Sequence, residues 1–144
     1  MRVRDILETK GSDVVTTTVE SSLLALSRLL TAHRIGAAVV VDRRGSIVGI
    51  ASERDLVIAV ASRGPGALEG AVMDVMSSEV LICEPDDDVQ TVMSIMTERR
   101  IRHMPVLDPE GRLAGVISIG DVVKVRVGEV EQEARMLRDY IEAR

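Results

Sequence analysis

The strongest constraint on the fold of this 144-residue chain is that its sequence repeats itself. Residues 80–123 align without a gap to residues 14–57, and 11 of the 44 aligned positions are identical. Many of the other pairs exchange one aliphatic residue for another, as Leu23 does with Val89. A shorter matching segment precedes each copy, at residues 3–7 and 72–76. A repeat of this kind predicts one supersecondary unit that is built twice.

Each copy predicts the same order of elements. Short apolar segments at residues 14–15 and 80–83 are expected as first strands. An amphipathic helix follows, because apolar residues recur at spacings of three and four: Leu23, Leu26, Leu29 and Leu30, then Val89, Val92, Met93 and Met96. Hairpins are predicted at 37–51 and 104–117, where two apolar segments flank an Asp-x-x-Gly turn. A second helix begins at Ser52 or Ser118.

The predicted fold class is therefore mixed α/β (α+β), with two pseudo-twofold-related β-α-β-β-α repeats. The domains are expected to be a first repeat at 1–62, a linker at 63–68, a second repeat at 69–125 and a C-terminal helix extension at 126–144. The sequence Arg-Gly-Pro-Gly at 63–66 marks the linker. Since one small sheet cannot be covered on both faces, we expect the two copies to bury each other and form one globule.

Composition excludes several classes of protein. The net charge of −5 and the single aromatic residue, Tyr140, argue against binding to nucleic acid. The single cysteine, Cys83, allows no internal disulfide and is expected as a small buried hydrophobe. The N-terminus shows no signal peptide, and no apolar stretch approaches the roughly 20 residues of a membrane span. We therefore expect a soluble cytoplasmic protein with no membrane partner.

The sequence shows no sign of catalysis. No nucleophile has an adjacent base, no glycine-rich phosphate loop with lysine is present, and no His/Cys cluster has the spacing of metal ligands. The acidic run at 86–88 lies at a predicted helix start, where the helix dipole stabilises it. The sequence thus predicts a protein that is not an enzyme and has neither a catalytic cofactor nor a metal.

Each copy ends in a specific motif. An Asp-x-x-Gly turn is followed by Gly-apolar-x-Ser-x-x-Asp, within residues 42–55 and again within 101–121. The second copy precedes this motif with Ile-Arg-His-Met-Pro, whereas the first has Ile-Gly-Ala-Ala-Val and lacks the proline. Over residues 1–125 this pattern resembles the tandem cystathionine-β-synthase (CBS) domain pair, also called a Bateman module.

The resemblance implies a function and a set of site residues. Such pairs bind AMP, ADP, ATP, NAD or, as the weakest candidate here, S-adenosylmethionine in clefts between the repeats, and they regulate attached or partner proteins. The aspartate bonds the ribose hydroxyls and the serine lies near ribose or phosphate, which implies roles for Ser52, Asp55, Ser118 and Asp121. Backbone that grips the adenine would come from Val14, Gly36, Ala37 and Ala38, and from Val80, Arg102, His103, Met104 and Pro105.

Other interpretations stay open. Each Ser-x-x-Asp is also a helix capping box in outline, and the two roles are compatible because a helix N-terminus attracts phosphate. Gly49 and Gly115 favour binding, because capping does not require them whereas a backbone close to a ligand would. Arg102 and His103 are either phosphate-favouring charges or solvated residues at a strand edge. The two clefts are expected to differ in affinity, or one to be empty, and a structural dimerisation scaffold with vestigial clefts is the alternative function.

The C-terminal segment predicts a long helix with an apolar stripe. From Asp121 to about residue 143 the apolar residues follow heptad steps of four and three: Val123, Val127, Val130, Ala134, Leu137 and Ile141. The other faces are charged, and Gly128 interrupts the helix at a cost of about 1 kcal/mol. We expect a second copy of the chain to cover this stripe in a homodimer; the alternative is that the helix packs back onto its own chain.

Overall fold

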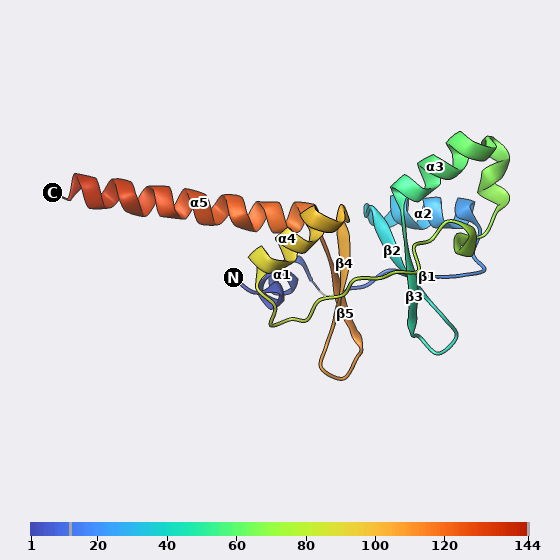
Figure 1. Ribbon diagram of the computed structural model, residues 1–144, viewed down its shortest axis with the longest axis horizontal. Helices are drawn as coiled ribbons and strands as arrows, with labels where there is room; N and C mark the ends of the chain where they lie inside the picture. Colours follow the sequence, from blue (N-terminus) through green and yellow to red (C-terminus); the bar gives the residue numbers. More distant parts are fainter. Residues whose placement is uncertain (12, 144) are drawn as a thin grey trace. The chain divides into compact units, whose positions relative to one another are not determined.

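The computed structural model describes residues 1–11 and 13–143, and its helices and strands follow the predicted order with two differences: a helix over residues 3–10 precedes the first copy, and the second copy has no first strand (Figure 1). The fold is mixed α/β, with two small sheets and a long C-terminal helix. The elements in chain order are α1 (Val3–Lys10), β1 (Thr16–Thr18), α2 (Leu23–His33), β2 (Ala37–Val41), β3 (Ile47–Ser52), α3 (Glu53–Arg63), the 3-10 turns η1 (Pro65–Glu69) and η2 (Val72–Asp74), α4 (Val89–Arg99), β4 (His103–Leu107), β5 (Leu113–Ser118) and α5 (Ile119–Glu142).

The chain divides into two compact units, and their boundaries cut across the sequence repeat. The β1–β3 unit is formed by Asp13–Leu81, and the β4–β5 unit joins Met1–Ser12 to Ile82–Arg144. The segment that leads each copy in sequence therefore belongs to the unit of the other copy. Helix α1 packs with β5 and α5, whereas the turn η2 belongs to the unit that contains α2, β2 and β3. The domain boundaries expected from the repeat stay a prediction.

The β1–β3 unit is a three-stranded sheet covered by helices. Strand β1 runs parallel to β2, with Thr16 opposite Val39, and β2 pairs antiparallel with β3, with Ala37 opposite Ser52. The α2 face that the sequence periodicity predicts is confirmed, since it is buried in this core together with residues of the sheet: Leu23, Leu26, Leu30, Ala38, Val40 and Ala51. The turn Asp42-x-x-Gly45 closes the hairpin, as predicted, with Gly45 at a positive φ of 81°.

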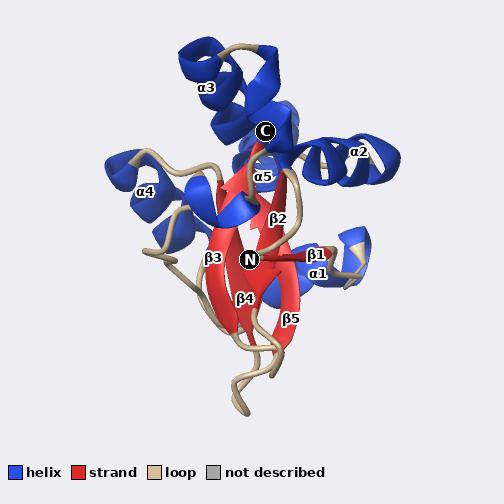
Figure 2. Cartoon of the chain, turned by 90° about the vertical axis from the view of Figure 1, so that its right-hand side faces the viewer, coloured by secondary structure: helices blue, strands red, loops and turns tan. Residues whose placement is uncertain are grey.

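The β4–β5 unit repeats this arrangement with a two-stranded sheet. Figure 2 draws β4 and β5 as paired strands, and His103 lies opposite Ser118 in their register. The core combines residues of α1, α4, the hairpin and α5 with Cys83: Val3, Ile6, Cys83, Val89, Val92, Met96, Met104, Val106, Ile117 and Val122. The prediction of a buried Cys83 is confirmed, and burial followed by the nearby Asp87 charge raises the pKa of its thiol to about 12. Cys83 is therefore a packing residue.

The two predicted first strands are shifted or shortened. In the first copy the strand begins at Thr16, beyond the predicted residues 14–15, because β-branched residues continue through this stretch and give no sharp boundary. In the second copy only Cys83 bridges to Val106, in parallel, and no ladder forms over 80–83. The chain turns directly afterwards, where Pro85 has no N–H to donate and the Glu84 N–H bonds to an Asp87 carboxylate oxygen at 2.8 Å.

The glycines of the repeated motif are explained by packing inside each unit. A Cβ on Gly49 would lie 2.7 Å from Met76 Sδ and 2.9 Å from the Ser77 carbonyl oxygen. A Cβ on Gly115 would lie 2.6 Å from Leu7 Cδ2. Because neither glycine has a side chain, the segment that leads the other copy can pack closely against the second hairpin strand of each unit. This contact replaces the sequence-based argument that the glycines indicate a ligand passing close to the backbone.

Substituting these glycines tests that packing. Gly49→Ala should cost about 1–3 kcal/mol of unfolding free energy, because a backbone carbonyl blocks the new methyl group. Gly115→Ala should cost less, since the obstacle is the flexible end of the Leu7 side chain. Urea unfolding of the two variants beside the wild type measures both values, and equal costs would contradict this account.

Candidate functional site

The junction between β3 and α3 gathers most of the predicted site residues of the first copy. The β2–β3 register places Ala37 opposite Ser52, the residue at which the strand ends and the helix begins. The Glu53 N–H then donates to the Gly36 carbonyl oxygen at 2.9 Å. The backbone of residues 36–37 is thereby held beside the first turn of α3.

Ser52 and Asp55 form a complete capping box at this junction. The Ser52 N–H and hydroxyl donate to Asp55 Oδ2 at 2.8 and 3.1 Å, and the Asp55 N–H donates to Ser52 Oγ at 3.3 Å. Both side chains are half-buried. The capping interpretation of the motif is thus confirmed, and an N-cap of this type contributes roughly 1 kcal/mol to stability. The box fixes the Asp55 carboxylate at the positive end of the helix dipole.

The β4–β5 unit builds the same junction from the second copy. His103 lies opposite Ser118, and the Ile119 N–H donates to the Arg102 carbonyl oxygen at 2.8 Å. The Ser118 N–H donates to Asp121 Oδ2 at 2.8 Å, and the Asp121 N–H donates to Ser118 Oγ at 3.2 Å. The backbone geometry is therefore duplicated as well as the sequence.

Lys10 distinguishes the second junction from the first. From the end of α1 its ammonium lies 2.7 Å from Asp121 Oδ2 and donates to the Val116 carbonyl oxygen at 2.9 Å. Partial burial alone would raise the pKa of Asp121, but the Lys10 hydrogen bond, the Ser118 N–H and the Lys10 charge outweigh it and hold the pKa below its usual value of 3.8. The sequence alone does not mark Lys10 as a site residue, because only the fold brings α1 beside this junction.

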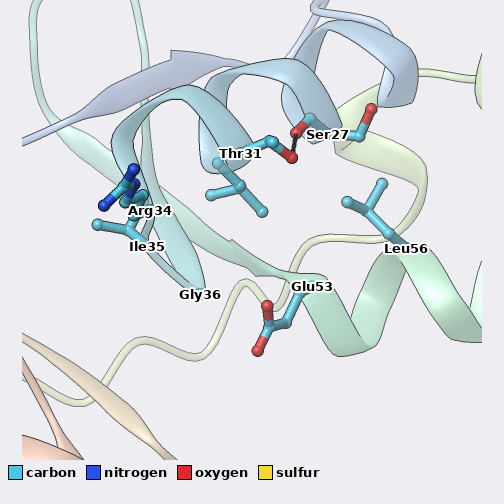
Figure 3. A pocket seen from close by; sticks show the side chains of 8 residues that line it. Ser27, Thr31, Arg34, Ile35, Gly36, Glu53 and Leu56 are labelled. Atoms are coloured by element: carbon cyan, nitrogen blue, oxygen red, sulfur yellow. Dashed lines mark hydrogen bonds between the residues drawn. The ribbon is translucent and has the colours of Figure 1, made fainter.

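A pocket of about 430 Å³ opens beside the first junction, within the β1–β3 unit (Figure 3). It lies between the C-terminal half of α2 and the start of α3, and its size is in the range of small-molecule sites. Figure 3 shows Glu53 and Leu56 of α3 across the pocket from α2. The lining residues are Ser27, Leu30, Thr31, Arg34, Ile35, Gly36, Glu53 and Leu56.

Of the predicted site residues only Gly36 lines this pocket, and the others at its wall were missed. A signal for two of them was present, because Thr31 and Arg34 are identical to Thr97 and Arg100 in the alignment of the copies. Arg34 and Arg100 share a further property: each ends its helix in the left-handed conformation, with φ of 54° and 55°. An arginine at this position complements the negative end of the helix dipole, which gives it a structural role as well.

The remaining predicted residues offer backbone rather than side chains. Ala38, Met104 and Pro105 are buried, and the side chains of Ala38 and Met104 lie in the cores of their units. Val14 is half-buried and precedes β1. Val80 belongs to the β1–β3 unit, whereas 102–105 belong to the β4–β5 unit, so neither unit alone contains the whole predicted set of the second copy.

Comparison with known proteins identifies the family. The family model of the CBS domain matches residues 3–62 and 72–128. The chain belongs to the CBS domain family. Its two matches make it a tandem CBS pair, which confirms the resemblance found in the sequence, and they include the Ser-x-x-Asp junction of each copy.

Solved CBS structures resemble the chain over most of its length. The CBS-domain containing protein ATU1752 from Agrobacterium tumefaciens is 47% identical, with a TM-score of 0.84 over 88% of this chain and 99% of its own. The CBS domain protein PAE2072 from Pyrobaculum aerophilum, complexed with AMP, is 29% identical, with a TM-score of 0.75 over 84% and 89%. The CBS domain pair of protein MJ0100, in complex with 5'-methylthioadenosine and S-adenosyl-L-methionine, is 25% identical, with a TM-score of 0.80 over 90% and 98%.

The Lys10–Asp121 pair predicts a loss of stability in acid. Because the folded-state pKa of Asp121 is lowered, the charged pair stabilises the protein above about pH 4, and this contribution is lost as the pH falls through the folded pKa. The wild type should lose about 0.5–1 kcal/mol more than Asp121→Asn between about pH 7 and pH 3, since a partly exposed pair is screened by solvent. Urea unfolding across this pH range measures it. Parallel curves for the two proteins would contradict the assignment.

Proposed function

We propose that this CBS pair is a regulatory protein that binds an adenosine ligand at its two Ser-x-x-Asp junctions. The observation that carries the proposal is the duplicated junction: in each unit one carboxylate is fixed at a helix N-terminus, beside backbone held by a hydrogen bond across the hairpin. Relatives of the same fold contain AMP, or 5'-methylthioadenosine and S-adenosyl-L-methionine, which supports ligands of this class.

The geometry suits a ribose and a phosphate. Among the described residues, every hydrogen bond to the Asp55 and Asp121 carboxylates ends on Oδ2. Oδ1 of each can therefore accept from a ribose hydroxyl without disturbing the cap. The N-terminus of α3 or α5 supplies a positive dipole end for phosphate oxygens. The backbone of 36–38 or 102–105 supplies donors and acceptors for an adenine edge, as amide groups can pair with both.

Ligand binding would act by stabilising the folded state of each unit. A ligand present at 100 times its dissociation constant adds about 2.7 kcal/mol to the unfolding free energy. This stabilisation would be transmitted to a regulated protein or to a second copy of this chain. We assign no reaction to the protein, because the hydroxyls of Ser52 and Ser118 are engaged as helix caps.

A thermal-shift panel with AMP, ADP, ATP, NAD, S-adenosylmethionine and 5'-methylthioadenosine tests the proposal. At least one ligand should raise the melting temperature of the wild type by several degrees. Asp55→Asn and Asp121→Asn keep an acceptor for the cap but remove the carboxylate, so each should reduce the shift. Asp74→Asn is the matched control, because Asp74 caps a different element, the turn η2, where it accepts from the Ala71 N–H at 3.2 Å.

The outcome distinguishes a ligand-binding regulatory protein from a structural dimerisation scaffold. No shift with any ligand, or an equal shift in all variants, would contradict binding at the junctions. The first of these results would favour a structural dimerisation scaffold.

The two sites are expected to prefer different ligands. Lys10, Arg102 and His103 place basic groups in the β4–β5 unit. In the other unit the stretch that follows η2 at the front of the second copy, residues 76–81, contains no basic residue. The Lys10 ammonium can turn from Asp121 to a ligand phosphate, so the Asp121 site should favour AMP over the uncharged 5'-methylthioadenosine. The Asp55 site should discriminate less.

Lys10→Met tests this difference in an Asp55→Asn background, in which binding at the Asp55 site is weakened. The affinity for AMP should fall about tenfold, because one charge-assisted hydrogen bond to phosphate is lost. The affinity for 5'-methylthioadenosine should be unchanged or higher, and isothermal titration calorimetry measures both. Equal losses for the two ligands would show that Lys10 only supports the fold of the junction.

A further inference from the structure

Helix α5 carries an exposed apolar stripe beyond the core of its unit. Val122 is buried and Val125 packs against the core, so one face of the first turns is already used. The helix then continues without interruption through Gly128 to Glu142 and extends away from the rest of its unit (Figure 1). Five large residues along the predicted heptad stripe are about half exposed or more: Val123, Val127, Val130, Leu137 and Ile141. Among the described residues, every helix is too short or too polar to span a lipid bilayer.

The stripe fits the seam of a two-stranded coiled coil. In heptad notation Val127, Ala134 and Ile141 are a positions, and Val123, Val130 and Leu137 are d positions. The segment 123–141 is long enough for a seam of about 27 Å, at 1.5 Å per residue. We propose that α5 pairs with α5 of a second copy as a parallel, in-register coiled coil.

The charges beside the seam select the parallel orientation. In a parallel pair, the residue at g faces the residue five positions later, at e, on the second helix. Arg126 then faces Glu131 of the second copy, and Glu133 faces Arg138 of the second copy. Both pairs join opposite charges, and twofold symmetry makes each occur twice. Arg126 also bonds Glu129 on its own helix at 3.3 Å, so the Glu133–Arg138 pair should contribute more.

The antiparallel alternative of equal length is repulsive. Antiparallel helices bring e against e and g against g. The register that overlaps 123–141 completely places Glu131 against Glu131, Glu133 against Glu133, and Lys124 against Arg138. Like charges at such positions oppose association, which is how coiled coils specify orientation. The sequence therefore favours the parallel pair by attraction and disfavours the antiparallel pair by repulsion.

This inference deepens the proposed function, because it identifies the surface through which a second copy would receive the regulatory change. The regulatory role of the coiled coil rests on the proposed function, whereas the coiled coil itself does not. Dimer formation and ligand binding are measured separately, so either can fail alone. Since α5 begins at the Ser118–Asp121 cap, a ligand at Asp121 would bind at the first turn of the helix that forms the dimer.

Sedimentation of matched variants tests the seam. Leu137 and Met136 are neighbours of similar exposure, 61% and 64%, but only Leu137 lies on the seam. The wild type should sediment as a dimer that dissociates on dilution. Leu137→Lys should raise the dimer dissociation constant by about 100-fold, because both copies lose a buried leucine. Met136→Lys should leave the dissociation constant unchanged.

Cysteine crosslinking tests the orientation. Ala134→Cys should form a disulfide with its own equivalent under mild oxidation, because a faces a in a parallel in-register pair. Gln132→Cys, on the outer face, should remain reduced, and the buried Cys83 should not interfere. Arg138→Glu should weaken the dimer about tenfold, and the double variant Glu133→Arg/Arg138→Glu should recover it, since the exchanged charges pair again.

Several results would overturn the inference. A wild-type monomer at high micromolar concentration would remove the dimer altogether. A dimer that is insensitive to Leu137→Lys would show that the copies associate through another surface. A seam that binds anionic lipid vesicles or a different protein without self-association would assign the stripe to that partner.

A retained thermal shift with adenosine ligands in Leu137→Lys would show that the variant is folded and that the binding sites are intact.

Discussion

The structure depends on a capped helix that starts directly from the end of a hairpin. The serine of each Ser-x-x-Asp ends the second hairpin strand, and the aspartate three residues later accepts a hydrogen bond from the serine N–H. This exchange converts strand to helix within one residue. It also fixes a carboxylate at the positive end of a helix. The same interaction therefore determines the chain path and supplies the group that would recognise a ribose.

Each unit contains the segment that leads the other copy, and this gives the two copies different surroundings. Because α1 belongs with the second copy, Lys10 reaches Asp121, whereas the Asp55 cap accepts only from Ser52 among the described residues. The glycine three residues before each serine makes this packing possible, since a side chain there would meet Leu7 or the Met76–Ser77 backbone and side chain. Two nearly identical motifs thus become two different electrostatic sites.

The sequence predicted what periodicity and duplication encode. The buried faces of α2 and α4, both hairpins, the capping motif and the CBS family were all evident, because each follows from residues near one another in the chain. Lys10 beside Asp121 and Leu7 against Gly115 were not predictable, since these contacts join residues more than a hundred positions apart. The pocket at Arg34 was missed for another reason: a helix-ending arginine carries a structural explanation that hides its position at a cavity wall.

Amide chemical shifts during an AMP titration test the central claim most directly. In an assigned ¹H–¹⁵N spectrum of the full chain, the account predicts that the largest changes lie at the N–H groups of Gly36, Ser52 and Asp55 and at those of Arg102, Ser118 and Asp121. Their saturation should follow one or two binding constants. Saturable changes confined to other segments, with these six amides unmoved, would contradict it.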